Sequence, residues 1–270
     1  MSHLLRSHAP ITDTAWALID EEAKTRLTPG LAARRLVDFS GPLGWEHSAT
    51  NLGRVETVPN DGLAGVTARR RRVLPLVELK SSFSLDREEL LAGDRGAEDV
   101  DLDPVALAAI EMVEAENKAV FHGNAALGFE GIVEASTHPE ISSGDTIDAY
   151  PAAVAQAVEQ LLRIGIGGPY GLALGREDYT AVVETGEHGG YPLLDHLRKI
   201  LGGPIVWAPG VDGAVVLSLR GGDFLFESGQ DLAVGYSTHD AQSVQLYIEQ
   251  SFSFRVVTPE AAIRVTPVTA

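Results

Sequence analysis

The chain has 270 residues, of which 44% are hydrophobic and 22% are charged, a composition typical of a globular protein with a sizeable core. Its 38 acidic residues outnumber its 21 Lys and Arg residues, and the formal net charge is −17. This balance argues against nucleic acid and against anionic membrane surfaces as partners, because both bind proteins through basic side chains.

The sequence contains no cysteine, which excludes disulfides, thiolate metal sites and cysteine nucleophiles. No stretch approaches the roughly 18 apolar residues that a membrane-spanning helix needs. Residues 1–10 lack the apolar segment of a secretory signal. We therefore expect a cytoplasmic protein without a membrane partner.

The first predicted helix begins near Thr12 or Asp13, since either residue can cap a helix N-terminus. Its apolar residues follow at helical spacing: Trp16, Ile19, Ala23 and Leu27. Pro29 and Gly30 interrupt the pattern, and residues 31–37 form a second short segment.

Residues 50–80 are predicted to form a long hairpin, because Asn60, Asp61 and Gly62 are a strong turn signal. The arms are only weakly apolar, and four arginines, Arg69–Arg72, occupy the returning arm. Two isolated strands are marginally stable in water. The hairpin is therefore either a solvated loop or an arm that lies on the acidic surface of a neighbouring subunit.

The clearest predicted helix opens at Asp103 and Pro104, because proline is favoured at the first helical position. Its expected apolar face consists of Leu107, Ile110, Val113, Val120 and Phe121. Three acids are expected to point elsewhere: Glu111, Glu114 and Glu116.

From residue 148 onward the sequence alternates between helical and strand patterns. Helices are predicted from Pro151, over 177–184 and over 192–201, and strands over 170–174, 205–208 and 214–219. The last third alternates at strand period. The mixture predicts an α+β fold with an inserted α/β lobe near residues 137–220.

No catalytic or metal-binding constellation emerges from the sequence. Asp99, Asp101 and Asp103 have the odd-position spacing of a calcium loop, but Pro104 stands where the sharp-turn glycine belongs. His188 and His196 lack further ligands for a zinc site. We expect no catalytic residues, no metal and no enzymatic activity of the chain itself.

Seven short strings occur in a fixed order: RSHAPIT (6–12), GPLGWE (41–46), GPY (168–170), RGGDF (220–224), GQDLAVGY (229–236), QLY (245–247) and EQSFSF (249–254). Their order and spacing closely resemble those of the encapsulin shell proteins, also called the linocin-type bacteriocin family. The resemblance extends to about residue 265.

This resemblance implies the tailed-phage major capsid fold (Hong-Kong-97-like), an α+β fold with a peripheral domain, an extended loop and an axial domain. The expected division is 1–49 for the N-terminal helix and the start of the peripheral domain, 50–80 for the extended loop, 81–136 for the peripheral domain with its spine helix, 137–220 for the axial domain, and 221–270 for the return to the peripheral domain.

The resemblance also implies a function. Many copies would form a hollow icosahedral nanocompartment that encloses a cargo enzyme, a peroxidase or a ferritin-like iron oxidase, through a targeting peptide at the cargo's C-terminus. The matching peptide-binding positions are Leu27, Leu31, Arg34, Val37, Asp38, Leu232, Val234 and Tyr236. Aliphatic side chains would hold an extended peptide, and Arg34 and Asp38 would fix its polar ends. The alternative is that the apolar members are ordinary core.

Two further sites follow from the resemblance. A pore loop at the five-fold axis would include Glu184, Glu187, His188 and Tyr191, and its repeated acids would favour cations. Some family members bind a flavin through an aromatic residue in a segment that matches 83–89 here. Arg87 occupies the position where a Trp is expected, so we predict weak flavin binding or none.

Two other functions remain open. A phage capsid protein would share the fold but enclose DNA, which the charge of −17 disfavours. A secreted bacteriocin or protease would need an export signal and a nucleophile, and the sequence suggests neither.

Overall fold

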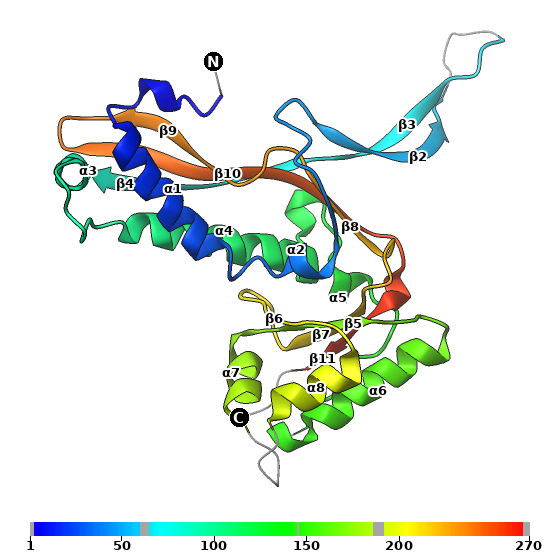
Figure 1. The fold of residues 1–270 in the computed structure, drawn as a ribbon. Coiled ribbons are helices and arrows are strands. Elements are labelled where there is room, and N and C mark those ends of the chain that lie inside the picture. The colour runs from blue at the N-terminus through cyan, green and yellow to red at the C-terminus, as the bar shows by residue number, and fades with distance from the viewer. Residues whose placement is uncertain (1–2, 60–64, 145, 186–191, 267–270) are drawn as a thin grey trace.

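The computed structural model describes residues 3–59, 65–144, 146–185 and 192–266. Figure 1 shows two bodies joined along the chain, with a two-stranded ribbon that projects away from both. No described helix is long and apolar enough to cross a membrane.

A five-stranded sheet forms the upper body. Its strands are β1 (Asp38–Ser40), β4 (Val77–Asp86), β8 (Phe224–Ser228), β9 (Ala233–His239) and β10 (Ser243–Val256). The long strand β10 pairs with β4 along one edge and with β9 and then β8 along the other, always antiparallel. The predicted strand structure in this last third of the chain is confirmed, since β10 is one 14-residue strand, but residues 246–254 of that strand are all buried rather than alternately buried and exposed.

Helices cover the face of this sheet, as Figure 1 shows. They are α1 (Asp13–Leu27), α2 (Ala33–Leu36), α3 (Arg87–Asp94) and α4 (Asp103–His122). The predicted cap is confirmed: the Thr12 hydroxyl accepts a hydrogen bond of 3.1 Å from the Ala15 N–H. The predicted apolar stripe of α1 is buried from Trp16 to Leu27.

The predicted apolar face of α4 is partly wrong. Val113, Val120 and Phe121 are buried, but Leu107 is 63% exposed and Ile110 is 43% exposed. The buried face also carries several alanines beside Val105 and Met112: Ala106, Ala108 and Ala109. Glu116 was expected to point elsewhere and is instead fully buried. Small side chains let α4 lie close to α1 and β4, and Glu116 is tolerated inside because it has a cationic partner.

The ribbon consists of β2 (Ala49–Thr57) and β3 (Arg69–Pro75), which pair antiparallel as predicted. The predicted turn at residues 60–62 lies outside the described residues. Val55 and Val73 are about half exposed, and every arginine of 69–72 is exposed. Each strand therefore packs mainly on the other.

The lower body contains a four-stranded sheet in the order β11-β7-β5-β6. Its strands are β5 (Tyr170–Leu174), β6 (Ile205–Trp207), β7 (Ala214–Ser218) and β11 (Ala262–Val265), and its helices are α6 (Tyr150–Arg163), α7 (Arg176–Glu184) and α8 (Leu193–Leu201). β5 and β7 are buried throughout, which is typical of central strands.

The end of the chain divides between the two bodies. β8, β9 and β10 belong to the first sheet, whereas β11 pairs antiparallel with β7 in the second. The division expected from the sequence places all of residues 221–270 with the upper body. The difference has a physical reason: Ala262, Ile263 and Val265 are apolar and become buried only against the second sheet.

Short elements complete the described chain: α5 (Ile132–Ala135) and the 3-10 turns η1 (Arg6–His8), η2 (Ala125–Leu127), η3 (Ile147–Ala149) and η4 (Pro259–Ala261). Two hydrophobic clusters fill the interior. One lies among α1, α4 and the β4–β10–β9 region, and the other extends from β8 and β10 into the lower body.

Candidate functional site

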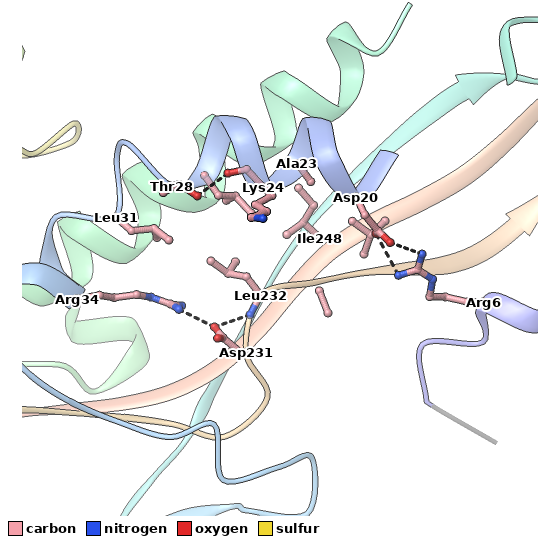
Figure 2. Close-up of a pocket in the computed structure, with 13 residues that line it drawn as sticks. Arg6, Asp20, Ala23, Lys24, Thr28, Leu31, Arg34, Asp231, Leu232 and Ile248 are labelled. Carbon is pink, nitrogen blue, oxygen red and sulfur yellow. Dashed lines mark hydrogen bonds and ion pairs between the residues drawn. The ribbon is translucent and has the colours of Figure 1, made fainter. Parts of the chain in front are cut away.

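A groove of about 400 Å³ lies between α1 and β9, with Ile248 of β10 beneath it. Figure 2 shows side chains from both walls directed into it. Its lining consists of Arg6, Asp20, Ala23, Lys24, Leu27, Thr28, Leu31, Arg34, Asp231, Leu232, Ala233, Val234 and Ile248. The groove thus combines an aliphatic centre with charged groups at both ends.

The wall formed by α1 ends in a turn that fits closely against α4. The N–H of Thr28 donates to the Lys24 carbonyl, so the helix closes at Thr28. Gly30 follows, and a Cβ at this position would lie 2.6 Å from Cγ1 of Val113. A larger residue here would require the Val113 side chain to move. The close turn at Gly30 brings Leu31 and then Arg34 to the end of the groove.

Asn117 of α4 fixes this turn from below. It is fully buried, its Nδ2 donates to the carbonyls of Gly30 (2.8 Å) and Pro209 (3.0 Å), and its Oδ1 accepts from the Ala33 N–H at 3.1 Å. Both amide hydrogens and the carbonyl oxygen of this side chain are therefore used. Asn117 holds the start of α2 in place and joins it to the lower body.

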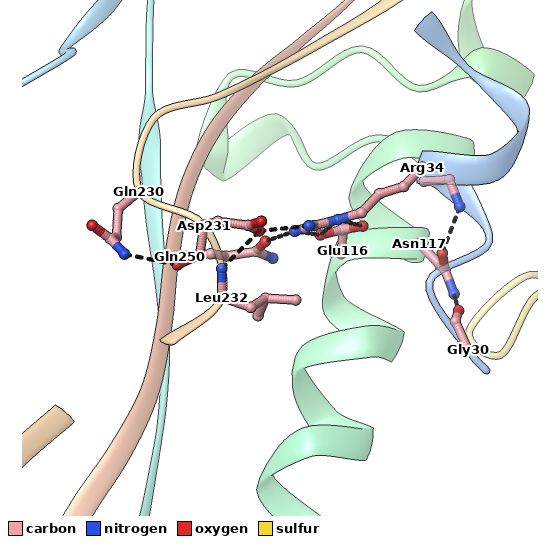
Figure 3. Close-up of polar contacts among 9 residues, drawn as sticks. Gly30, Arg34, Glu116, Asn117, Gln230, Asp231, Leu232 and Gln250 are labelled. Atoms are coloured by element: carbon pink, nitrogen blue, oxygen red, sulfur yellow. Dashed lines mark hydrogen bonds and ion pairs between the residues drawn. The ribbon is translucent and has the colours of Figure 1, made fainter. Parts of the chain in front are cut away.

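Arg34 organises the polar end of the groove (Figure 3). Its Nη2 donates to Glu116 at 2.8 Å and to the Gln250 amide oxygen at 2.7 Å, and its Nη1 donates to Asp231 Oδ1 at 2.6 Å. Its Nε also donates to both oxygens of Glu116. The guanidinium is therefore held in one orientation by three elements: α4, β10 and the loop before β9.

Burial and charge act in opposite directions on this network. Burial raises the pKa of Glu116, and the charge and hydrogen bonds of Arg34 offset only part of that effect. Burial alone would lower the pKa of Arg34, but the carboxylates of Glu116 and Asp231 outweigh it and raise that pKa. The two groups differ because Arg34 has two anionic neighbours, whereas Glu116 is fully buried with one cation.

The opposite end of the groove is closed by the N-terminal segment. Arg6 donates two hydrogen bonds to Asp20, of 3.1 and 2.7 Å, and its guanidinium lies 4.0 Å from the centre of the Trp16 ring. The carbonyl of Leu4 accepts from the Tyr236 N–H at 2.9 Å, which attaches the segment to β9. Figure 2 shows the Arg6–Asp20 pair beyond the aliphatic centre.

The structure brings together five of the eight positions named for peptide binding: Leu27, Leu31, Arg34, Leu232 and Val234. The other three lie outside the groove lining. Val37 packs against the second hydrophobic cluster, Asp38 accepts a hydrogen bond from the Gly222 N–H at 2.7 Å, and Tyr236 bonds to His239.

Sequence reasoning missed several groove residues. Asp20 and Lys24 precede Thr28 at intervals of four, which marks a polar row beside the apolar stripe of α1. Asp231 was not named either, although its neighbour Leu232 is one of the positions named for peptide binding. Glu116 carries no sequence signal, because it is one of several acids on α4.

The remaining predicted sites can be placed only in part. Glu184 is the exposed last residue of α7, whereas Glu187, His188 and Tyr191 lie outside the described residues. Arg87 begins α3, and its side chain donates to the Asp240 carbonyl at 3.1 Å. Within the described part of the chain, no three His, Asp or Glu side chains are grouped as metal ligands.

The fold has counterparts among capsids. A virus-like particle protein from Pyrococcus furiosus aligns over 92% of this chain and 98% of its own, with a TM-score of 0.66 and 18% identity. The capsid of an empty GTA particle aligns over 90% of each chain, with a TM-score of 0.54 and 14% identity. The chain therefore has the capsid fold of Hong-Kong-97 type, as expected.

The sequence relatives define the family. Residues 1–253 match the family model described as an encapsulating protein for peroxidase. A type 1 encapsulin shell protein of Rhodospirillum rubrum is 48% identical over 97% of this chain and 96% of its own, and one of Rhodococcus erythropolis is 42% identical over 97% and 99%. The chain belongs to the encapsulin shell protein family, and its role is structural.

Proposed function

We propose that copies of this chain assemble into a closed hollow shell, and that the groove between α1 and β9 holds an extended peptide of a cargo enzyme against the shell wall. The capsid fold and the shell-protein relatives support the assembly. The observation that carries the cargo function is the groove itself: aliphatic side chains lie between polar ends, an arrangement that suits an extended peptide with aliphatic side chains.

The ribbon of β2 and β3 gives a second observation that supports assembly. Of the arginines in 69–72, only Arg70 has a carboxylate partner among the described residues, namely Glu56. The ribbon projects from the body, as Figure 1 shows, and a two-stranded ribbon alone is marginally stable. A neighbouring copy supplies the missing partner, because the chain is strongly acidic overall.

The cargo is expected to be a peroxidase or a ferritin-like iron oxidase. The description of the matching family names a peroxidase. The pore at residues 184–191, the cytoplasmic location and the weak or absent flavin binding stay predictions.

The cargo function is tested by co-expression with a peroxidase that carries a C-terminal targeting segment, either full length or lacking that segment. We expect the full-length enzyme to co-sediment with wild-type shells and the truncated enzyme to remain in the supernatant. Leu232→Asp places a charge in the groove, and we expect its shells to assemble without cargo. Equal co-sedimentation of both enzymes, or unchanged loading of Leu232→Asp shells, would contradict the proposal.

A further inference from the structure

The groove has a positive charge on one wall and a negative charge on the other, and neither is fully paired with described residues of the chain. On the α1 wall, the ammonium group of Lys24 has no carboxylate partner within the described part of the chain. Lys24 is exposed, and Figure 2 places it on the side of α1 that borders the groove. A bound peptide would therefore meet an unpaired cation at this point.

The end of the groove at Arg34 has more negative than positive charges. One cation, Arg34, stands against two carboxylates, Glu116 and Asp231. Asp231 uses only one oxygen, since its Oδ1 accepts from Arg34 at 2.6 Å and from the Leu232 N–H at 2.8 Å. No hydrogen bond from a described residue reaches its Oδ2, and the side chain is 40% exposed. This end thus offers a free acceptor with a net negative charge.

The Arg6 end is balanced, because Arg6 and Asp20 satisfy each other through two hydrogen bonds. The groove therefore has a charge sequence along its length: negative at Asp231, positive at Lys24 and neutral at Arg6. An extended peptide passes these points in a fixed order, because its residues advance by about 3.3 Å each.

We propose that the groove selects its peptide by charge order as well as by aliphatic side chains: a cationic side chain lies against Asp231, and a carboxylate lies against Lys24. This inference rests on the proposed function and specifies the chemistry of the peptide. It also assigns Arg34 as a positioning residue, since its donors are directed at Glu116, Gln250 and Asp231 rather than at a ligand.

The test measures binding of fluorescein-labelled peptides of about ten residues, an extended length of about 33 Å, to purified wild-type shells. All peptides share the same Leu, Gly and Ser residues. One has no charged side chain, one has a Lys and a Glu in one order, and one has the same two residues exchanged. Amidated and free-acid forms distinguish a Glu side chain from a terminal carboxylate as the group that meets Lys24.

We expect one charge order to bind about two- to fivefold more tightly per matched charge than the exchanged order, the range of partly exposed ion pairs. In Lys24→Gln shells, the carboxylate of the peptide should no longer increase the affinity, whereas the lysine of the peptide still should. Asp231→Asn keeps an amide oxygen for Arg34 and for the Leu232 N–H, and should remove the preference for the lysine only. Lys118→Gln and Asp99→Asn make the same charge changes at exposed positions outside the groove and should change nothing.

The outcomes separate the two proposals. If the uncharged peptide binds, if Leu232→Asp abolishes that binding, and if charge order has no effect, the charge selection is wrong and the groove function stands. If no peptide binds wild-type shells, the groove function is wrong and the charge selection falls with it. An effect of Lys24→Gln no larger than that of Lys118→Gln would also overturn the inference.

Discussion

The groove and the ribbon differ in what a single copy of the chain provides for them. The groove is complete within one chain, because a buried network around Arg34 fixes its polar end and two secondary structure elements form its walls. The ribbon has exposed arginines and no hydrophobic core of its own.

This difference indicates two kinds of binding surface. The groove is preorganised, so under the proposed function a bound peptide would lose freedom while the protein would not, which favours affinity. In the proposed shell the ribbon would gain stability from contact with another copy, so its order would be coupled to assembly. A change in the ribbon should therefore act on particle formation, and a change in the Arg34 network on the subunit itself.

The largest effect is expected from the ribbon. Replacing Arg69–Arg72 together by Gln removes four positive charges from each copy, each worth about 0.2–1 kcal/mol in an exposed ion pair. We expect the particles to dissociate into small oligomers at a NaCl concentration that wild-type particles withstand, as measured by light-scattering mass across a salt series.

The matched control replaces the same four residues by Lys, which keeps the charges and loses only the guanidinium geometry. Its particles should persist close to the wild-type salt limit. If the Gln and Lys variants dissociated at the same salt concentration, the charge of the ribbon would have no part in assembly.

The second effect concerns Arg34. Arg34→Ala leaves the carboxyl of Glu116 fully buried without its cation, and losing one partner of a buried pair costs about 3–5 kcal/mol. We expect a clearly lower urea midpoint at matched protein concentration. Arg176→Ala breaks the exposed pair with Glu114 and should shift the midpoint little, since such pairs contribute about 0–1 kcal/mol. Similar shifts in both variants would show that the buried network does not stabilise the groove.

The third effect is a pH dependence of the same network. Burial raises the pKa of Glu116 in the folded protein above its value in the unfolded chain. The contribution of protonated Glu116 to the free energy of unfolding is therefore full when the pH lies below the pKa of a Glu in the unfolded chain, about 4.3. It is lost as the pH rises through the pKa of Glu116 in the folded protein. Glu116→Gln cannot titrate, so the free energy of unfolding of the wild type should fall relative to that of this variant as the pH rises. Urea unfolding of both proteins from pH 4 upward measures this, and a relative gain of the wild type would contradict it.

Much of the fold was predictable from local patterns. The stripe of α1 and the extended conformation of β10 depend on residues close together in the chain, and both were predicted correctly. The buried face of α4 was not, because it depends on distant partners: Arg34 is 82 positions from Glu116 and 197 from Asp231. The pairing of β11 with β7 is equally non-local.

The groove was predictable only through resemblance to a family. Leu27, Leu31, Leu232 and Val234 look like ordinary core residues in the sequence, and their place at an open groove is a property of packing. Lys24 and Asp231 were missed because a single exposed charge has no distinctive pattern. Their significance comes from which described residues they do and do not contact, which only the folded chain reveals.

The most direct test of shell formation is the light-scattering mass of the purified wild-type protein, with negative-stain images of the same fraction. We predict a species of megadalton mass that appears as round, hollow particles of uniform size. A stable monomer or small oligomer at the same concentration would contradict shell formation, even though the capsid fold of the subunit would stand.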